Sequence, residues 1–286
     1  MPRSGDQADD RGGRRALAAL PAGGSSAAET IGGPAPSKPA ARGLHVVATP
    51  IGNRGDITLR AVETLRGVDL VVCEDTRVSG PFLRTLGVTA PLLAYHDHNA
   101  ERVRPQIMAR LTAGAAVALV SDAGTPLVSD PGFRLVGECI ARGVPVTTLP
   151  GPSAPLAALV LAGLPTDRFM FAGFLPPRAG ARGETLSELA RVPATLVFLE
   201  TAPRLADSLA QMAQMLGDRP AAVARELTKL HEEVRRGPLA ALAEHYRTAG
   251  PPRGEIVVVV GPPAPRAAAD AAEVDAGLRA ALATMR

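Results

Sequence analysis

From residue 44 onward, short runs of β-branched residues alternate with segments of helical spacing, and this alternation restricts the chain to a few folds. A short β-branched run between turn residues is typical of a strand, and the intervening segments are long enough for the helical crossovers that parallel strands require. The pattern predicts strands at 44–49, 68–73, 91–95, 115–121 and 144–148, with helices at 58–66, 79–86, 99–113 and 132–142. These elements predict an α/β domain with a mostly parallel sheet.

A second set of alternating elements follows a turn rich in proline and glycine at 149–153. It predicts strands at 169–174, 194–199, 221–226 and 255–260, with helices at 183–191, 204–216 and 239–248. A helix predicted at 154–162 precedes this second set and is expected to belong to the first domain. We therefore expect two α/β domains, joined near Gly163–Asp167. The expected divisions of the chain are a disordered tail at 1–43, domains at 44–163 and 164–261, and an Ala-rich tail at 262–286.

The sequence carries no strong signal for export or membrane insertion. Arg14 and Arg15 precede a short apolar stretch that faintly resembles a secretion signal, but proline and glycine interrupt it. No apolar run reaches the roughly 18 residues of a membrane helix. Cys73 and Cys139 stand in apolar sequence without metal-ligand spacing, so we expect buried thiols in a reducing, cytoplasmic environment.

The charge of the chain is small and unevenly distributed. The net charge is +3, and the first 43 residues hold six cations and four acids, which leaves +1 for the rest. A nearly neutral fold argues against nonspecific coating of nucleic acid, although a local basic groove remains open. Only Lys38 and Lys229 among the 31 cations are lysines. Because an ammonium can lose its proton on burial and a guanidinium cannot, Lys229 is a candidate for chemistry, with retention on a solvated surface as the alternative.

Ligands of open α/β sheets bind beyond the carboxyl ends of the strands. Three predicted strands end in turns of proline, glycine and small residues, at Thr49–Asp56, Ser121–Gly132 and Leu149–Ala154. Such turns expose backbone groups and predict a cradle for a flat, polar small molecule. Glu74, about twenty residues beyond the first turn, leaves a nicotinamide or flavin dinucleotide open, although the turn lacks the Gly-x-Gly-x-x-Gly pattern.

Other strands end in charged residues. Glu74–Arg77 and His96–Asn99 follow two strands of the first domain, and Glu200–Arg204 and Arg225–Glu233 follow two of the second. Two histidines around an aspartate raise the hypothesis of a metal site. No third ligand has a matching spacing, so the sequence favours capping or hydrogen-bonding roles and no metal.

Taken together, these motifs resemble the bacterial 16S rRNA cytidine 2′-O-methyltransferases of the tetrapyrrole methylase superfamily. The resemblance covers about residues 44–261 and rests on motifs in the same order: Thr49–Asn53, Glu74–Arg77, His96–Asn99, Ser121–Gly132, Gly173–Pro176 and Glu226–Lys229. It departs at Glu200–Arg204, where the family usually has Glu-Ser-Pro-His-Arg, so a histidine is absent. Many relatives also carry a longer helical C-terminal extension.

The resemblance implies a homodimer of two α/β domains, with a mostly parallel first sheet, a mixed second sheet and S-adenosylmethionine in the cleft between them. It implies 2′-O-methylation of a decoding-centre cytidine in 16S rRNA of the small ribosomal subunit. By motif position, the residues expected at the cofactor are Pro50, Ile51, Gly52, Asp122, Gly124, Thr125, Pro126, Ser153 and Ala154. This interpretation displaces the dinucleotide and moves Glu74 to a substrate-side or structural cluster with Asp75 and Arg77.

Ribose methylation needs the hydroxyl oxygen, the methyl carbon and the sulfur in line, and a group that takes the proton. The candidates for that group are a lysine of lowered pKa or a carboxylate: Lys229, Glu200, Asp122 and Glu74. The candidates for RNA contact are Arg77, Arg84, His96, His98, Arg178 and Arg182, whose arginines form two pairs expected to be free of acids. Methylation of a tetrapyrrole carbon, or ribosome binding without turnover, are the alternatives.

Overall fold

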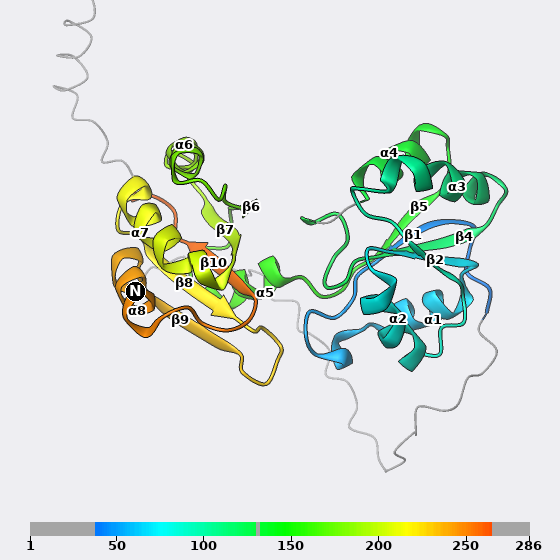
Figure 1. The fold of residues 1–286 in the computed structure, drawn as a ribbon, viewed down its shortest axis with the longest axis horizontal. Helices are drawn as coiled ribbons and strands as arrows, with labels where there is room; N and C mark the ends of the chain where they lie inside the picture. Colours follow the sequence, from blue (N-terminus) through cyan, green and yellow to red (C-terminus); the bar gives the residue numbers. More distant parts are fainter. Residues whose placement is uncertain (1–37, 130–131, 265–286) are drawn as a thin grey trace, which may run out of the picture. The chain divides into compact units, whose positions relative to one another are not determined.

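Two five-stranded sheets, each packed against helices, make up the computed structural model (Figure 1), which describes residues 38–129 and 132–264. The predicted tails lie outside these ranges except at their inner ends, as do Asp130 and Pro131 of the predicted cradle. The first strand begins at Gly43, and the Ala40 amide already donates a hydrogen bond of 2.9 Å to the Gly67 carbonyl. Residues before the predicted boundary at 44 therefore pack on the first domain.

The first sheet is entirely parallel, with the order β3-β2-β4-β1-β5. Its strands are β1 (Gly43–Val47), β2 (Leu70–Cys73), β3 (Leu92–Ala94), β4 (Ala116–Val120) and β5 (Val146–Leu149). Its helices are α1 (Leu59–Gly67), α2 (Thr76–Thr85), α3 (Ala100–Thr112) and α4 (Phe133–Ala141), with a 3-10 turn η1 (Arg54–Asp56). The predicted parallel α/β sheet is confirmed. Helix α2 begins three residues early because the Asp75 side chain caps the Arg77 amide.

Helices cover both faces of this sheet, and its inner strands β1, β2 and β4 are accordingly buried on both sides. Side chains alternate along a strand, so Val46 packs in the cluster with α3 and α4, whereas Val47 packs in the cluster with α1 and α2. Figure 1 shows the two helix pairs on opposite sides of the strands. The carboxyl ends of all five strands consequently meet at one edge, where the loops gather.

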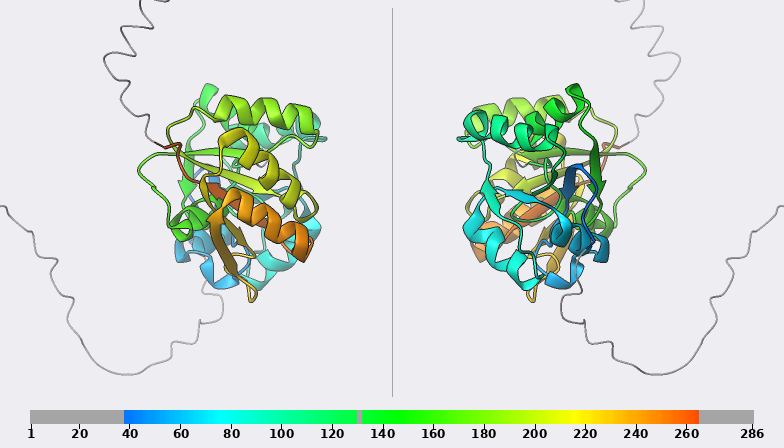
Figure 2. Two further views of the ribbon diagram at one scale, coloured as in Figure 1. Left: turned by 90° about the vertical axis from the view of Figure 1, so that its left-hand side faces the viewer. Right: turned by 90° about the vertical axis from the view of Figure 1, so that its right-hand side faces the viewer.

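The second sheet is mixed, with the order β6-β7-β10-β8-β9 and only β6 parallel to its neighbour. Its strands are β6 (Phe169–Phe174), β7 (Thr195–Glu200), β8 (Pro220–Arg225), β9 (Glu233–Pro238) and β10 (Ile256–Val260). Helices α6 (Ala179–Leu189), α7 (Leu205–Leu216) and α8 (Leu239–Ala249) cover one face (Figure 2, left), and η2 (Ala202–Arg204) precedes α7. Strand β9 was not predicted, because this edge strand is polar and partly exposed.

Helix α5 (Ala154–Ala162) covers the other face of the second sheet. Ala158, Leu159 and Ala162 are buried there against β7, β8 and β10, together with Ile51 from the loop after β1. The predicted junction near Gly163–Asp167 therefore differs from the structure, since α5 packs on the second sheet and the link precedes it. No helix within the described ranges is long and apolar enough to cross a membrane.

Candidate functional site

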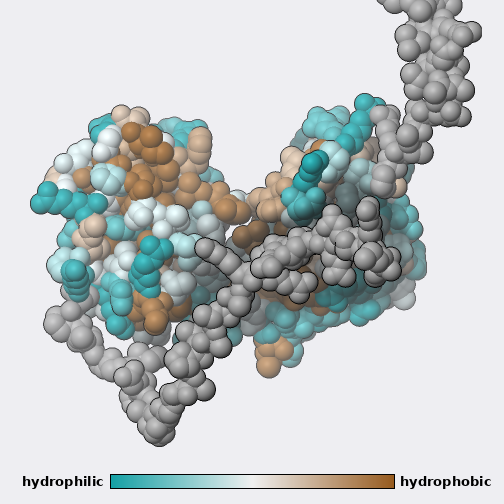
Figure 3. Space-filling view, turned by 180° about the vertical axis from the view of Figure 1, so that it is seen from behind, coloured by the Kyte–Doolittle hydropathy of each residue, from teal (hydrophilic) through white to brown (hydrophobic). Residues whose placement is uncertain are grey.

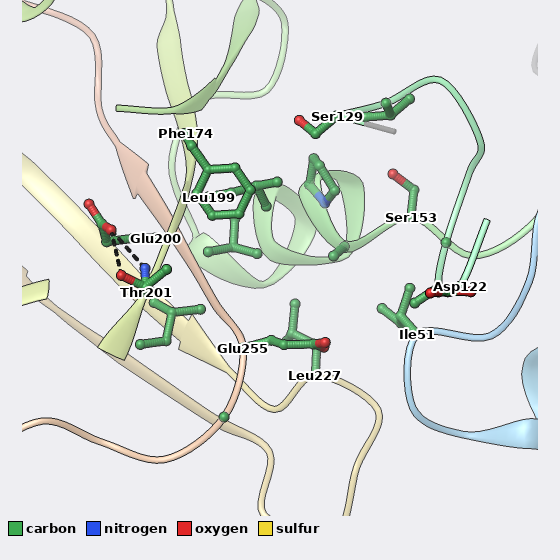
Figure 4. Close-up of a pocket in the computed structure, with 18 of the residues that line it drawn as sticks. Ile51, Asp122, Ser129, Ser153, Phe174, Leu199, Glu200, Thr201, Leu227 and Glu255 are labelled. Atoms are coloured by element: carbon green, nitrogen blue, oxygen red, sulfur yellow. Dashed lines mark hydrogen bonds between the residues drawn. The ribbon is translucent and has the colours of Figure 1, made fainter. Parts of the chain in front are cut away.

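The loops after β1, β4 and β5 enclose a cavity of about 560 Å³ together with residues of the second sheet (Figure 4). From the first sheet and α5 come Ile51, Asp122–Thr125, Val128, Ser129 and Ser153–Pro155. From the second sheet and its loops come Phe174, Leu199–Pro203, Leu227 and Gly254–Val257. The volume is that of a site for a small molecule or cofactor. We call it the first cavity.

The first cavity is apolar apart from a few polar groups, and its charged side chains are all carboxylates. They are Asp122, Glu200 and Glu255, and no lysine, arginine or histidine is among the described residues that line it. Carboxylates in a partly closed, apolar site favour a cationic ligand and oppose an anionic one. The lining therefore disfavours the polyphosphate of a dinucleotide, which the sequence analysis had left open.

Hydrogen bonds between the three loops fix the wall of this cavity on the first domain. Thr49 and Gly124 exchange backbone hydrogen bonds of 2.8 and 3.0 Å. The Thr125 hydroxyl donates to the Pro152 carbonyl at 3.0 Å, which ties the β4 loop to the β5 loop. Gly124 has a φ of +81°, and a β-carbon added to it would stand 3.3 Å from the Ile51 side chain. The predicted cradle of backbone groups is thus a cross-linked set of loops.

Backbone strain is concentrated beside the cavity. Among the described residues other than glycine, those with a left-handed φ are Leu127, Ser129, Glu226 and Thr228. They lie in two segments. The segment after β4 contributes Ser129 to the lining of the cavity, and the segment after β8 contributes Leu227. A left-handed φ costs a non-glycine residue of order 1 kcal/mol or more and persists at sites where the surrounding structure requires it.

A second, smaller cavity of about 250 Å³ adjoins the first. It is lined by Thr49–Gly52, Arg54, Val78, Ser79, Phe82, Leu83, Val120–Ala123, Lys229 and Glu255. Ile51, Asp122, Ala123 and Glu255 line both cavities. Unlike the first cavity, the second contains two cations, Arg54 and Lys229.

Most of the predicted cofactor residues meet at the first cavity. Six of the nine line it: Ile51, Asp122, Gly124, Thr125, Ser153 and Ala154. Pro50 and Gly52 line the second cavity instead. Pro126 is buried and lines neither, so its place is in the wall of the β4 loop.

Lys229 lies beside the second cavity and is held by two carboxylates. Its Nζ atom lies 2.8 Å from Glu226 Oε1 and 3.1 Å from Glu255 Oε2. Burial lowers the pKa of Lys229, but the hydrogen bonds and charges of Glu226 and Glu255 outweigh it and raise the pKa above its ordinary value. The two carboxylates that hold the ammonium therefore favour its protonated form and act against the lowered pKa of the sequence-based hypothesis.

The aliphatic part of Lys229 crosses the loop after β1. A β-carbon at Gly52 would stand 2.4 Å from Lys229 Cγ, so only glycine fits there. The Asn53 amide donates a hydrogen bond of 3.1 Å to the Thr228 hydroxyl. The turn after β8 is thus fastened to the loop after β1 at the border of the two cavities.

Glu200, at the end of β7, is 3% exposed and its carboxylate is fully engaged. Figure 4 shows the amide and hydroxyl of Thr201 donating to Oε1, at 2.7 and 3.4 Å. The Ser208 hydroxyl and Arg204 Nη2 donate to Oε2 at 2.6 and 3.4 Å. This arrangement anchors the start of α7, and it leaves Glu200 poorly suited to take a proton from a substrate.

Asp122 and Glu74 lie near each other at the ends of β4 and β2. Asp122 Oδ1 accepts hydrogen bonds from the Ser79 hydroxyl at 3.1 Å and the Asp75 amide at 3.4 Å, whereas no described residue donates to Oδ2. Burial, followed by the charges of Asp122 and Asp97, raises the pKa of Glu74. Glu74 lines neither cavity, so of the four predicted proton acceptors only Asp122 borders both with a free oxygen.

The predicted RNA contacts are only partly at the surface. Arg77 is not free of acids, since its Nη2 lies 2.6 Å from Asp75 Oδ2, and its hydrogen bonds lower the pKa of Asp75 to about 2. Arg182 is 7% exposed and donates to the Gln211 side chain at 2.5 Å, so its prediction as an RNA contact is wrong. Arg84 and Arg178 are exposed, as the prediction requires.

The two histidines of the 96–99 loop have different surroundings. His98 is exposed, and its ring lies 6.0 Å from that of His96. The Asn99 side chain accepts from the His96 amide at 2.9 Å and donates to the Ala94 carbonyl at 3.0 Å, which fixes the loop. No group of three or more potential metal-binding side chains occurs within the part of the chain that the structure describes.

Sequence reasoning missed several residues that line the cavities. Val78 and Phe82 are ordinary apolar positions of a helix in the sequence, and Gly254 and Glu255 precede a strand without any recognisable motif. The one available signal was Gly254, two residues before a β-branched run, because a glycine beside a strand often marks a close approach of another group. A β-carbon there would stand 2.2 Å from Glu226 Oε1.

Comparison with known proteins is consistent with this architecture. The family described as Tetrapyrrole (Corrin/Porphyrin) Methylases matches residues 43–243. The cobalt precorrin-4 methyltransferase structure has a TM-score of 0.57 at 20% identity, covering 76% of this chain and 94% of its own. The uroporphyrin-III C-methyltransferase of Thermus thermophilus, complexed with S-adenosylhomocysteine, has a TM-score of 0.53 at 22% identity, covering 76% and 96%.

More similar sequences carry the name ribosomal RNA small subunit methyltransferase I. That of Mesorhizobium japonicum is 52% identical over 270 residues, which is 86% of this chain and 92% of the relative. That of Erythrobacter litoralis is 56% identical over 250 residues, or 87% and 88% of the two chains. That of Escherichia coli O157:H7 is 45% identical over 219 residues, or 76% and 77%. The chain therefore belongs to the tetrapyrrole methylase family of S-adenosylmethionine-dependent methyltransferases, and within it to the small-subunit ribosomal RNA methyltransferases I.

Proposed function

We propose that this protein transfers the methyl group of S-adenosylmethionine to the ribose 2′-oxygen of a decoding-centre cytidine in 16S rRNA. The relatives that carry the ribosomal RNA methyltransferase name support the class of substrate. The motifs shared with cytidine 2′-O-methyltransferases support the atom that is methylated. The observation that carries the proposal is the first cavity, whose charged lining consists of carboxylates only.

The residues of the first cavity fit this cofactor. S-Adenosylmethionine has a positive sulfonium and a positive amino group, and it offers an apolar ring system to the walls. Asp122, Glu200 and Glu255 supply negative charge, while Ile51, Leu199 and other apolar side chains supply the walls. Gly124 keeps one side of the β4 loop free of a side chain. When bound, the cofactor supplies an activated methyl group.

The reacting atoms must meet where the two cavities join, since cofactor and substrate enter from different sides of the same border. Asp122 stands at this border with Oδ1 fixed by Ser79 and Oδ2 free. We assign Oδ2 to accept a hydrogen bond from the ribose 2′-hydroxyl and to take its proton as the oxygen is methylated. Positioning of the reactants supplies the remainder of the rate enhancement, because attack requires the oxygen, the methyl carbon and the sulfur to be aligned.

Lys229 contributes charge rather than basicity in this mechanism. Its protonated ammonium faces the second cavity and offsets the carboxylates of Glu226 and Glu255. A cation at this place attracts the RNA backbone and steers the nucleotide toward Asp122. The exposed Arg84 and Arg178 serve the same purpose at greater distance.

We also propose that the protein acts in the cytoplasm as a homodimer. Helix α5 is apolar on all sides, yet Leu156 and Val160 are 49% and 76% exposed. A helix of this kind is normally buried on every side, so a second copy of the chain is the expected cover. Apolar side chains also reach the surface on the face drawn in Figure 3.

The test is methylation of small ribosomal subunits from cells that lack the gene, with labelled S-adenosylmethionine and mapping by reverse-transcription stops. We expect one 2′-O-methylated cytidine in 16S rRNA. Methylation of uroporphyrinogen instead, or binding to the subunit without transfer, would contradict the proposal. Binding that weakens steeply with salt is the expected signature of phosphate contacts, and a flat response would argue against them.

A further inference from the structure

We infer that the second cavity is the subsite for the target nucleotide, which enters it extruded from the RNA, with its base against α2 and its phosphate at Arg54. This inference rests on the proposed function. It names where the substrate lies and which side chains hold it.

The position of the second cavity carries the first step of the argument. It shares Ile51, Asp122, Ala123 and Glu255 with the first cavity, so a molecule in one is in reach of a molecule in the other. Its volume of about 250 Å³ admits a single small group and no double helix. A nucleotide whose 2′-oxygen must reach Asp122 therefore has to leave its stack, as in other enzymes that act on one nucleotide of an RNA.

The wall formed by α2 supplies a surface for a base. Val78 and Phe82 stand four residues apart, so they share one face of the helix, and both line the cavity. Val78 is 53% exposed, although an apolar side chain gains nothing from contact with water. A flat, uncharged ring is the group that such a wall accepts, and unstacked bases of RNA bind to apolar and aromatic side chains in this way.

The second cavity holds two cations beside the carboxylates Asp122 and Glu255 that it shares with the first cavity. Arg54 is exposed, and its guanidinium has no ion-pair partner within the described residues. Lys229 adds a second cation but is paired with Glu226 and Glu255. Arg54 is thus the free cation, and a phosphate is the anion that an RNA brings.

The experiment compares two variants with matched controls outside both cavities. Val78→Glu places a carboxylate on the base surface at an exposed position, so the fold is retained. Arg54→Ala removes the free cation. Ile140→Glu, at a 66% exposed position of α4, and Arg60→Ala, at an exposed position of α1, are the controls. The readouts are binding of small subunits in the presence of S-adenosylhomocysteine, kcat/KM of methyl transfer, and the Kd of S-adenosylmethionine by calorimetry.

We expect Val78→Glu and Arg54→Ala each to weaken subunit binding and lower kcat/KM about tenfold, mostly through KM, with the cofactor Kd within about twofold of wild type. Both controls should stay within about twofold in every readout. Wild-type binding and turnover by both variants would overturn the inference while leaving the proposed function intact. If the wild type binds subunits but methylates another atom, the proposed function fails, and the binding data still decide whether this cavity holds the nucleotide.

Discussion

The two cavities share a wall but differ in whether cations line them. The first contains Asp122, Glu200 and Glu255 and no cation among its described lining, whereas the second contains Arg54 and Lys229 beside the shared Asp122 and Glu255. On the proposed function, a cationic cofactor occupies the cavity without cations, and an anionic polymer occupies the cavity that contains them. The difference teaches that charge can sort two ligands over a short distance without a separate binding domain.

The border between the cavities depends on a few contacts from the turn after β8. Glu226 and Thr228 adopt left-handed conformations there, and Lys229 lies across Gly52. The chain thus accepts local strain where the two cavities adjoin, and changes at this border should have larger effects than changes on either outer wall.

The largest expected effect is that of Asp122→Asn, which removes the proposed proton acceptor, a residue that lines both cavities. The kcat of methyl transfer to small subunits should fall about 100-fold or more, because general-base catalysis contributes about that much. Single-turnover assays measure it, with Asp167→Asn at an exposed position as the control. Retention of more than a third of wild-type kcat by Asp122→Asn would rule out this role.

Next comes Gly254→Ala, which introduces a β-carbon 2.2 Å from Glu226 Oε1 at a φ of +98°. The free energy of unfolding should fall by about 2–3 kcal/mol, because strain adds to the displacement of Glu226 from Lys229. Gly143→Ala is the control, with a φ of +68° and nothing within 4 Å, and it should cost only about 1 kcal/mol. If urea unfolding gave the same loss of unfolding free energy for Gly254→Ala and Gly143→Ala, crowding at Glu226 would have no effect.

A smaller change is expected for Lys229→Met, which breaks the ion pairs at the border. The free energy of unfolding should fall by about 1–2 kcal/mol at pH 7, since the Lys229 and Glu226 side chains are only 29% and 20% exposed. Hydrogen bonding from Lys229 lowers the pKa of Glu226, so this stability is present above the ordinary carboxyl pKa and is lost as the pH falls through the lowered value. The raised pKa of Lys229 means that its share is present below its ordinary pKa and lost only at higher, alkaline pH.

The difference between wild type and Lys229→Met should therefore be largest near neutral pH and shrink toward pH 3, as measured by urea unfolding. Arg247→Met is the comparison, because it breaks an exposed pair with Glu244 and should cost less than about 0.5 kcal/mol. A loss that is the same at pH 3 and pH 7 would show that packing of Lys229, rather than its charge, is responsible.

The smallest expected effect is that of Glu255→Gln, which removes one carboxylate of the first cavity. The Kd of S-adenosylmethionine should rise about two- to fivefold, because the 74% exposed Glu255 contributes roughly 0.5–1 kcal/mol to a nearby cation. S-Adenosylhomocysteine lacks the sulfonium charge and should be affected less. Calorimetry with both ligands measures this, with Glu63→Gln as the control; identical changes would show that the charge of the cavity does not select the ligand.

Much of the first domain could be predicted from the sequence. Strands buried on both faces are nearly continuous apolar runs, such as Ala116–Val120, and each ends in a distinctive turn. Strand β9 escaped prediction because Glu233–Pro238 is a polar edge with partly exposed side chains. Helix α5 was assigned to the wrong sheet, since an apolar sequence does not say which surface it covers.

The surroundings of single charges were the hardest to predict. Arg77 and Arg182 both look free in the sequence, but a local turn pairs one with Asp75 and the packing of α6 on α7 buries the other. A prediction from burial alone gives the wrong direction for the shift in the pKa of Lys229. Glu255, which is 26 residues away in the sequence, is brought to Lys229 by β10 and helps to raise this pKa.

The sequence by itself determined that the chain alternates strands and helices, that loops after three strands bear small residues, and that these motifs belong to a methyltransferase family. Only the tertiary structure decided which charged groups line each cavity. Register places Ile256, the neighbour of Glu255, opposite Glu200 on antiparallel strands, so two carboxylates distant in sequence line one space. Local sequence patterns indicate which backbone conformation each segment prefers. An electrostatic environment, in contrast, is a sum over segments that meet only in the folded chain.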